Sequence, residues 1–385
     1  MTDIKKLLID LIRHVCCGAD APENIALSDD EGKLLYKLSK SHDLAHIIAL
    51  CVESGRVSVN EETAAAFAKQ KYTAIYRYGH SAYALGALSE ALEKAKIPFI
   101  PLKGSVIRDY YPEPWMRTSC DIDVLVHKED LDRAVQTLAS VGFEHKYSSA
   151  HDVSLYSRTG VHIELHFDLI EDHRANEAAE ILSNVWDYAE SSQGSEYRYR
   201  MRDEMFYFYH IAHMAKHFED GGCGIRPFLD LWVLDYRTDG DERLRRELLS
   251  RCDLLAFAKA AGRLAYAWFV KGEHDELTER MENYLLESGA YGTIENRVAV
   301  NRAKKGGRVK YILSRIWQPY DKLSVAYPSL KGRRLLTPIY QVRRWARIIG
   351  ERGFGKLKTE IKLSSSQSEE GSEQLKCLFD ELGLK

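Results

Sequence analysis

The chain has 385 residues and a formal net charge of −3, with 45% hydrophobic and 29% charged residues. This composition supplies enough apolar side chains for a core and excludes a globally disordered or collagen-like chain. The length predicts roughly two or three domains. The seven cysteines form no C-x-x-C pair, which disfavours zinc-finger and disulfide frameworks and predicts a reducing, cytoplasmic location.

The most apolar stretch, Leu254–Val270, is interrupted by Lys259 and Arg263. It is shorter than the ~20 apolar residues that a membrane span requires. We therefore expect a buried helix here and no transmembrane segment. The first residues carry Asp3 and Asp10 within a helical pattern, which is not the pattern of a secretory signal.

Basic residues gather in one part of the chain. Residues 296–363 contain 18 Lys and Arg but only 3 Asp and Glu, which indicates a basic face and suggests an anionic partner for this segment. Interleaved aromatic residues could stack on nucleic-acid bases. An anionic lipid surface or another polyanionic acceptor, and a merely solvated basic face, are the other interpretations.

The predicted elements begin with helices. Residues 1–94 have helical periodicity, and Thr63–Lys94 predicts one long helix or two. The pattern changes at Ile97, where Ile97–Leu102 predicts a short buried strand and Asp121–Val126 a second strand. Lys128–Val141 predicts an amphipathic helix. Three more strands are predicted, at Phe143–Tyr147, His151–Ser157 and Val161–Phe167.

After Asp168 the pattern is helical throughout, and Ser364–Glu373 has the composition of a flexible linker. The predicted helices are Ala175–Tyr188, Asp203–Phe218, Asp230–Tyr236, Asp241–Cys252 and Leu254–Val270. We expect an α+β fold in which a small mixed β-sheet lies between N-terminal and C-terminal helical regions. The expected units are residues 1–94, 95–170, 171–295, 296–363 and 364–385.

The strongest chemical signal is Asp121-x-Asp123 on the second strand. Side chains two residues apart on a strand share a face, so these carboxylates repel each other unless a cation lies between them. Glu164 alternates with apolar residues in Val161–Phe167 and shares its face with His162 and His166. If the two strands are neighbours, the three carboxylates form a site for one or two Mg²⁺ or Mn²⁺ ions.

Gly104-Ser105 lies between a predicted strand and a predicted short helix. Glycine allows a phosphate to approach the backbone, and amides at a helix start can bind its oxygens. Lys103 and Arg117 flank this pair, where they could neutralise a triphosphate. The alternatives are a strand-end lysine and an arginine in an ordinary ion pair.

Three histidines, His210, His213 and His217, share one face of the predicted helix Asp203–Phe218. One interpretation is zinc binding. A second is a cleft in which they and Lys216 contact the nucleotide or the acceptor, and a third is packing beneath neighbouring aromatic residues. His166 has two interpretations as well, a place near the metal ions or simple strand packing.

The order of strand, Gly-Ser, helix, Asp-x-Asp and a later acidic strand resembles the DNA polymerase β-like nucleotidyltransferase superfamily. Leu102-Lys103-Gly104, Arg117–Val126 and Ile163–His166 resemble more closely an uncharacterised bacterial nucleotidyltransferase-like family, as do His210–His217 and Phe228–Leu231. The resemblance covers roughly residues 30–270. It implies that Gly104 and Ser105 hold phosphates, that Asp121 and Asp123 bind metal ions, and that Glu164 is the third carboxylate or the general base.

The expected activity is transfer of a nucleoside monophosphate from an NTP to an unidentified acceptor, with release of pyrophosphate. The acceptor is expected between the sheet and the helices around His210–His217. A non-catalytic nucleotide-binding or scaffold module of the same fold is one alternative. A protein that binds nucleic acid or an anionic surface through residues 296–363 is the other.

Overall fold

The computed structural model describes residues 3–20, 22–169, 177–270, 272–290, 292–305, 308–352 and 369–384. It confirms the predicted α+β class, because one mixed five-stranded sheet lies among helices that precede and follow it. Within the described residues, none of the helices combines the length and the apolar character needed to cross a bilayer.

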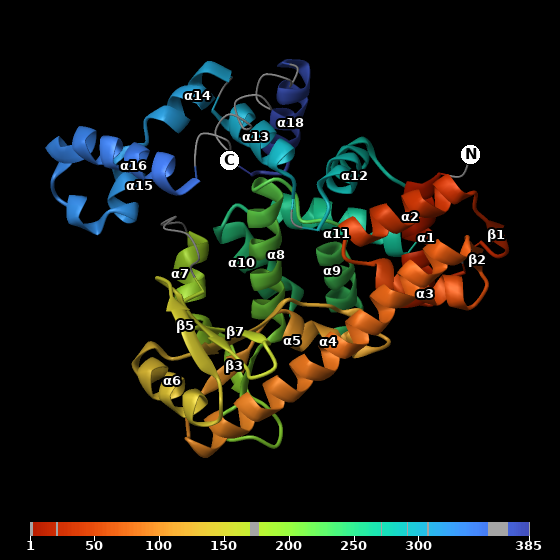
Figure 1. Ribbon diagram of the computed structural model, residues 1–385, viewed down its shortest axis with the longest axis horizontal. Coiled ribbons are helices and arrows are strands. Elements are labelled where there is room, and N and C mark those ends of the chain that lie inside the picture. Colours follow the sequence, from red (N-terminus) through yellow and green to blue (C-terminus); the bar gives the residue numbers. More distant parts are fainter. Residues whose placement is uncertain are drawn as a thin grey trace.

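The N-terminal region is helical, as predicted. Its helices are α1 (Ile4–Cys17), α2 (Asp29–Ser41), α3 (Ala45–Glu53) and α4 (Glu61–Lys94), and two-residue strands β1 (Ile25–Ala26) and β2 (Val57–Ser58) pair in parallel between them. The Asn60 side chain accepts a hydrogen bond from the Thr63 amide and starts α4. This single 34-residue helix connects the N-terminal helices to the sheet (Figure 1).

The central sheet has the strand order β3-β4-β7-β6-β5, in which only the β4–β7 pair is parallel. All five predicted strands are present, as β3 (Phe99–Pro101), β4 (Asp121–Val126), β5 (Glu144–Ser148), β6 (Asp152–Tyr156) and β7 (His162–His166). On one face, apolar residues of β4 and β7 pack against α4 and against α6 (Leu131–Ser140), which follows η3 (Lys128–Asp130). Because strand side chains alternate between faces, the acidic residues point to the opposite face.

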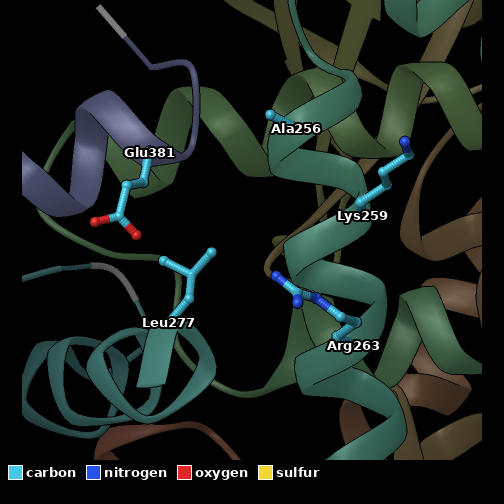
Figure 2. Close-up of a pocket in the computed structure, with 5 residues that line it drawn as sticks. All are labelled: Ala256, Lys259, Arg263, Leu277 and Glu381. Atoms are coloured by element: carbon cyan, nitrogen blue, oxygen red, sulfur yellow. The ribbon is translucent and has the colours of Figure 1, made fainter. Parts of the chain in front are cut away.

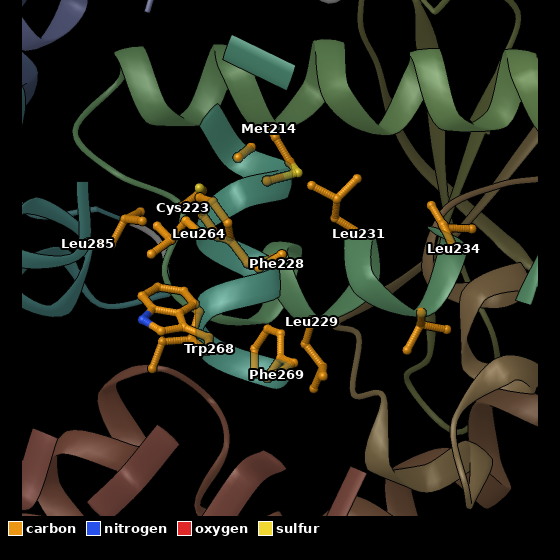
Figure 3. Close-up of a cluster of buried hydrophobic side chains, with 14 of the residues drawn as sticks. Met214, Cys223, Phe228, Leu229, Leu231, Leu234, Leu264, Trp268, Phe269 and Leu285 are labelled. Atoms are coloured by element: carbon orange, nitrogen blue, oxygen red, sulfur yellow. The ribbon is translucent and has the colours of Figure 1, made fainter. Parts of the chain in front are cut away.

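A group of helices lies on the acidic side of the sheet, as Figure 1 shows. They are α8 (Asp203–Glu219), α9 (Arg226–Arg237), α10 (Glu242–Arg251), α11 (Leu255–Phe269) and α12 (Glu276–Ser288). Their shared core is rich in aromatic side chains; Figure 3 shows Phe228, Trp268 and Phe269 in one cluster with Met214 of α8 and Leu285 of α12. The large, rigid rings fix α8 and α9 as a stable support for the residues that they direct toward the sheet.

The prediction of uninterrupted helix after Asp168 is wrong at one place. After α7 (Glu177–Ser183) and η4 (Val185–Tyr188), the strands β8 (Ala189–Ser191) and β9 (Tyr199–Met201) form an antiparallel pair. Strands of three residues are too short to show alternation in the sequence. The connection between them continues onto the sheet edge, where the Phe99 amide donates to the Tyr197 carbonyl.

The C-terminal region contains α13 (Ile294–Lys304), α14 (Arg308–Ile316), α15 (Tyr320–Ala326), η5 (Pro328–Leu330), η6 (Arg334–Leu336), α16 (Thr337–Arg352) and α18 (Glu369–Glu381). The linker predicted for Ser364–Glu373 is wrong from Glu369 onward, where α18 begins; its first five residues lie outside the described part. The last residues pack against the rest of the protein, because Leu378 and Phe379 are buried and Phe379 contacts the ring of Phe218. Burial of these apolar side chains stabilises the helix even though the residues of its first turn are polar.

Candidate active site

The parallel pairing of β4 with β7 brings the three predicted carboxylates together. Asp123 is the register partner of Glu164, and Asp121 is the partner of His162. Ligand atoms of Asp121, His162 and Glu164 lie within 4.8 Å of one another, and so do those of Asp123, Glu164 and His166. We call Asp121, Asp123 and Glu164 the carboxylate wall.

Asp123 is the most tightly held of these acids. Its Oδ1 lies 2.9 Å from His166 Nε2 and 3.4 Å from Lys103 Nζ. Burial alone would raise the pKa of Asp123, but the Lys103 ammonium and the hydrogen bond from His166 outweigh it and hold this pKa well below the usual range. Asp123 is therefore an anion in the folded protein.

His166 is buried between two acids, since its Nε2 also lies 3.5 Å from Glu164 Oε2. Burial opposes its protonation, but the hydrogen bonds to Asp123 and Glu164 raise the pKa of His166 to about 9. A protonated imidazole thus supplies positive charge between the carboxylates. His166 therefore contacts two of the three carboxylates, although it does not line the cavity.

Asp121 shows that the wall is crowded with negative charge. Burial, followed by the neighbouring Asp123 and Glu164 carboxylates, raises the pKa of Asp121. A divalent cation would relieve this repulsion, and carboxylate oxygens are the ligands preferred by Mg²⁺ and Mn²⁺. The donor set therefore fits a divalent metal ion.

The turn before α5 (Gly104–Ile107) brings Lys103 to the carboxylate wall. The Ser105 amide donates to the Leu102 carbonyl across 3.1 Å, which closes a four-residue turn around Lys103 and Gly104. Lys103 has φ 43° and ψ −121°, the conformation of the first central residue of a type II′ turn, where glycine is usual. A lysine in this strained conformation places its ammonium next to Asp123 at a cost in backbone energy.

Gly104 packs closely against the residues that precede β4. A Cβ atom at this position would lie 3.2 Å from Ser119 Cβ and 3.4 Å from Arg117 Nη1. Gly104 and Ser105 are both buried, but only Gly104 lines the cavity. The Ser105 amide is already bonded within the turn, so Gly104 is the better placed of the two to meet a phosphate.

Arg117 is held by a buried acid of α9. Its Nε donates to both oxygens of Asp230, at 2.8 and 3.0 Å, and Asp230 also accepts a 2.7 Å hydrogen bond from the Tyr111 hydroxyl. Burial opposes charge on both partners, yet the pKa of Arg117 is raised by Asp230 and the pKa of Asp230 is lowered by Arg117. The ion pair that was one interpretation of Arg117 is therefore present, with a buried rather than a surface acid.

A second arginine of the site, Arg226, was not predicted from the sequence. Its Nη1 donates to Asp43 Oδ2 at 2.7 Å and lies 3.3 Å from the Thr118 carbonyl, while Thr118 Oγ1 donates to the same Asp43 oxygen at 2.7 Å. Asp43 belongs to the connection between α2 and α3, so the N-terminal helices contribute to the site. The available signal was weak: Arg226 lies two residues before the recognised Phe228–Leu231 segment.

The predicted histidine face of α8 is directed toward the sheet. His213 and His217 face each other with 3.1 Å between their Nε2 atoms, and His210 Nε2 lies 2.9 Å from the Pro227 carbonyl. Burial lowers the pKa of His210 and, more strongly, that of His213, so both are neutral at pH 7. Within the described residues, these histidines belong to no cluster of three metal ligands, and Lys216 does not line the cavity.

A cavity of about 310 Å³ lies between the sheet and α8 and α9, and Lys103, Gly104, Asp121 and Asp123 line its sheet side. Glu164 and His166 lie next to these acids but are not part of the lining. The other side is lined by His210, His213 and His217 of α8 and Arg226 of α9. Together with Arg117, whose Nη1 lies near Gly104, these residues form what we call the arginine–histidine wall. A larger, more open hollow lies between α11, α12 and α18 (Figure 2). Its Arg263 pairs with Asp275 and its Glu381 with Arg280, and within the described residues its lining contains no group of three metal ligands.

A mixed sheet with Asp-x-Asp on one strand, Glu on its parallel neighbour and a Gly-Ser turn beside them is the site architecture of a nucleotidyltransferase. Residues 28–270 match the family model described as an uncharacterised nucleotidyltransferase. The chain belongs to this family, and the resemblance noted in the sequence is confirmed. A search of curated proteins found no match to the chain.

Proposed function

We propose that this protein transfers a nucleoside monophosphate from an NTP to an acceptor hydroxyl or other nucleophile. One observation carries the proposal: Asp121 and Asp123 line a cavity that also contains Lys103, Gly104 and two arginines, and Glu164 lies within metal-ligand distance of both acids. Acids on one side and guanidinium groups on the other suit a triphosphate, which carries negative charge and is commonly bound through a divalent ion.

Asp121, Asp123 and Glu164 would hold Mg²⁺ or Mn²⁺. Such an ion, when bound, neutralises phosphate charge and polarises the phosphorus that is attacked. Asp123 is suited to this role because it is ionised and oriented by two hydrogen-bond donors. Glu164 is less buried than Asp123, so it is also suited to receive a proton from the acceptor.

The reaction forms a bond between the acceptor oxygen and the α-phosphorus and breaks the bond from that phosphorus to the β-phosphate oxygen. Pyrophosphate leaves, and the acceptor proton passes to a base, for which Glu164 is the proposed residue. Lys103 and Gly104 would bind the triphosphate, whereas Arg117 and Arg226 would neutralise its charge from the opposite wall. The NTP base and the acceptor are not specified by this chemistry.

The test is incubation of the full-length protein with each α-³²P-labelled NTP, Mg²⁺ or Mn²⁺, and a bacterial lysate as a source of acceptors. We expect label in a new product and release of pyrophosphate. Asp123→Asn and Asp121→Asn should reduce transfer by about 10²-fold or more, because each removes charge that the transition state requires.

Asp132→Asn is the matched control, since Asp132 is exposed on α6 and should leave transfer unchanged. Equal labelling by the wild type and Asp123→Asn would overturn the proposal. Tight binding of NTP without transfer to any acceptor fraction would favour the non-catalytic module instead.

A further inference from the structure

The C-terminal helices expose apolar side chains in ordered rows. On α14, Val309, Leu313 and Ile316 recur at i, i+4 and i+7 with exposed fractions of 70%, 58% and 45%. The same spacing is repeated at η6 and α16 by Leu335, Ile339 and Val342, which are 95%, 63% and 69% exposed. Each row is therefore a continuous apolar ridge along one helix face.

The apolar ridge on α16 does not lie on the helix face that packs into the core of this region. The inward face is covered by a small core of Leu323, Tyr327 and Leu330, against which Leu336 and Tyr340 pack. Gln341 and Arg344 are also buried, and Arg344 Nη2 donates to the Arg315 carbonyl at the end of α14. The outward row is therefore additional apolar surface that the fold does not use.

The exposed ridges lie in strongly basic surroundings. Residues 308–352 contain 11 Lys and Arg but only 2 Asp and Glu. Lys310, Lys331, Arg333, Arg343 and Arg347 are exposed among the apolar residues. Figure 1 shows α14, α15 and α16 extending away from the sheet. None of their residues lines the cavity, so this surface is separate from the candidate active site.

We propose that α14, η6 and α16 form a surface that binds anionic lipid bilayers. Aliphatic ridges bordered by Lys and Arg insert at the boundary of head groups and acyl chains, while the basic groups bind anionic head groups. A nucleic acid would match the charge but not the aliphatic rows, because bases stack on aromatic rings and phosphates contact polar groups. The helices lie on the bilayer, since each is too short to span it.

The test is co-sedimentation of the full-length protein with vesicles of phosphatidylcholine alone or mixed with an equal amount of phosphatidylglycerol. We expect sedimentation with the mixed vesicles only, and a decrease when salt is raised. The triple variant Leu335→Ser/Ile339→Ser/Val342→Ser should lower the vesicle partition by about tenfold or more. Lys331→Ser/Arg333→Ser should lower it by roughly fivefold per charge removed.

Tyr76→Ser/Tyr83→Ser is the matched control, because these α4 side chains are 68% and 77% exposed but lie outside the basic segment. It should sediment like the wild type, and circular dichroism should show that every variant is folded. Equal sedimentation with both vesicle types, or no sedimentation with either, would overturn the proposal. The proposal would also be overturned if the triple variant bound vesicles like the wild type but lost self-association or oligonucleotide binding.

Discussion

The two walls of the cavity are built by different physical means. The carboxylate wall depends on strand register, since β4 and β7 are hydrogen-bonded neighbours and their period of two places three acids on one face. The arginine–histidine wall depends on ion pairs between distant segments, namely the buried pair of Arg117 with Asp230 and the partly exposed pair of Arg226 with Asp43. Backbone pairing thus positions the acids, whereas side-chain electrostatics position the bases.

The largest expected effect comes from breaking the ion pair that supports the second wall. Asp230→Ala would leave Arg117 buried without its acid and the Tyr111 hydroxyl without its acceptor. An uncompensated buried charge typically costs about 3–5 kcal/mol, so the free energy of unfolding should fall by that amount in urea titrations. Tyr111→Phe removes one hydrogen bond from the same carboxylate and should cost about 1 kcal/mol; equal losses in both variants would contradict the assigned role of Arg117.

An intermediate effect is expected at the turn that joins the walls. Lys103→Gly and Lys103→Ala both remove the ammonium beside Asp123, and both should greatly reduce transfer. They differ in the backbone, because φ 43° at this position suits glycine and strains alanine by about 1–2 kcal/mol. Lys103→Gly should therefore unfold at higher urea concentration than Lys103→Ala, and equal midpoints would show that the turn is unstrained.

The smallest effect concerns the neutral histidines of the second wall. Burial lowers the pKa of His213 below its ordinary value of 6.5, so the unfolded chain binds more protons than the folded protein as the pH falls below 6.5. The contribution of the neutral His213 to the free energy of unfolding is therefore fully present above pH 6.5. It is lost as the pH decreases, by at most about 1.4 kcal/mol per pH unit for one group. In urea titrations at several pH values, His213→Gln should show a shallower decline than the wild type, and an equal decline in both proteins would contradict a neutral, buried imidazole at this position.

The two walls also differ in how well the sequence predicts them. Alternation in Asp121–Val126 and Val161–Phe167 predicted both strands and the strand face on which each acid lies, and the histidine spacing predicted the face of α8. That the two strands are neighbours was a condition of the predicted site, which the pairing of β4 with β7 meets. The partners of Arg117 and Arg226 lie 113 and 183 residues away along the chain, and no local pattern encodes such contacts. The β8–β9 pair escaped prediction because each strand has only three residues.

Thr118 and Arg226 both donate hydrogen bonds to Asp43. This shared acceptor has a consequence for the evolution of the fold. Recombination that exchanged the first ninety residues for another helical layer would deprive Arg226 and Thr118 of their common acceptor. The unit that must be retained together is therefore larger than the sheet and its three acids. Substitutions in the connection between α2 and α3 should therefore be limited together with substitutions at the start of α9, even though neither segment contains an acid of the carboxylate wall.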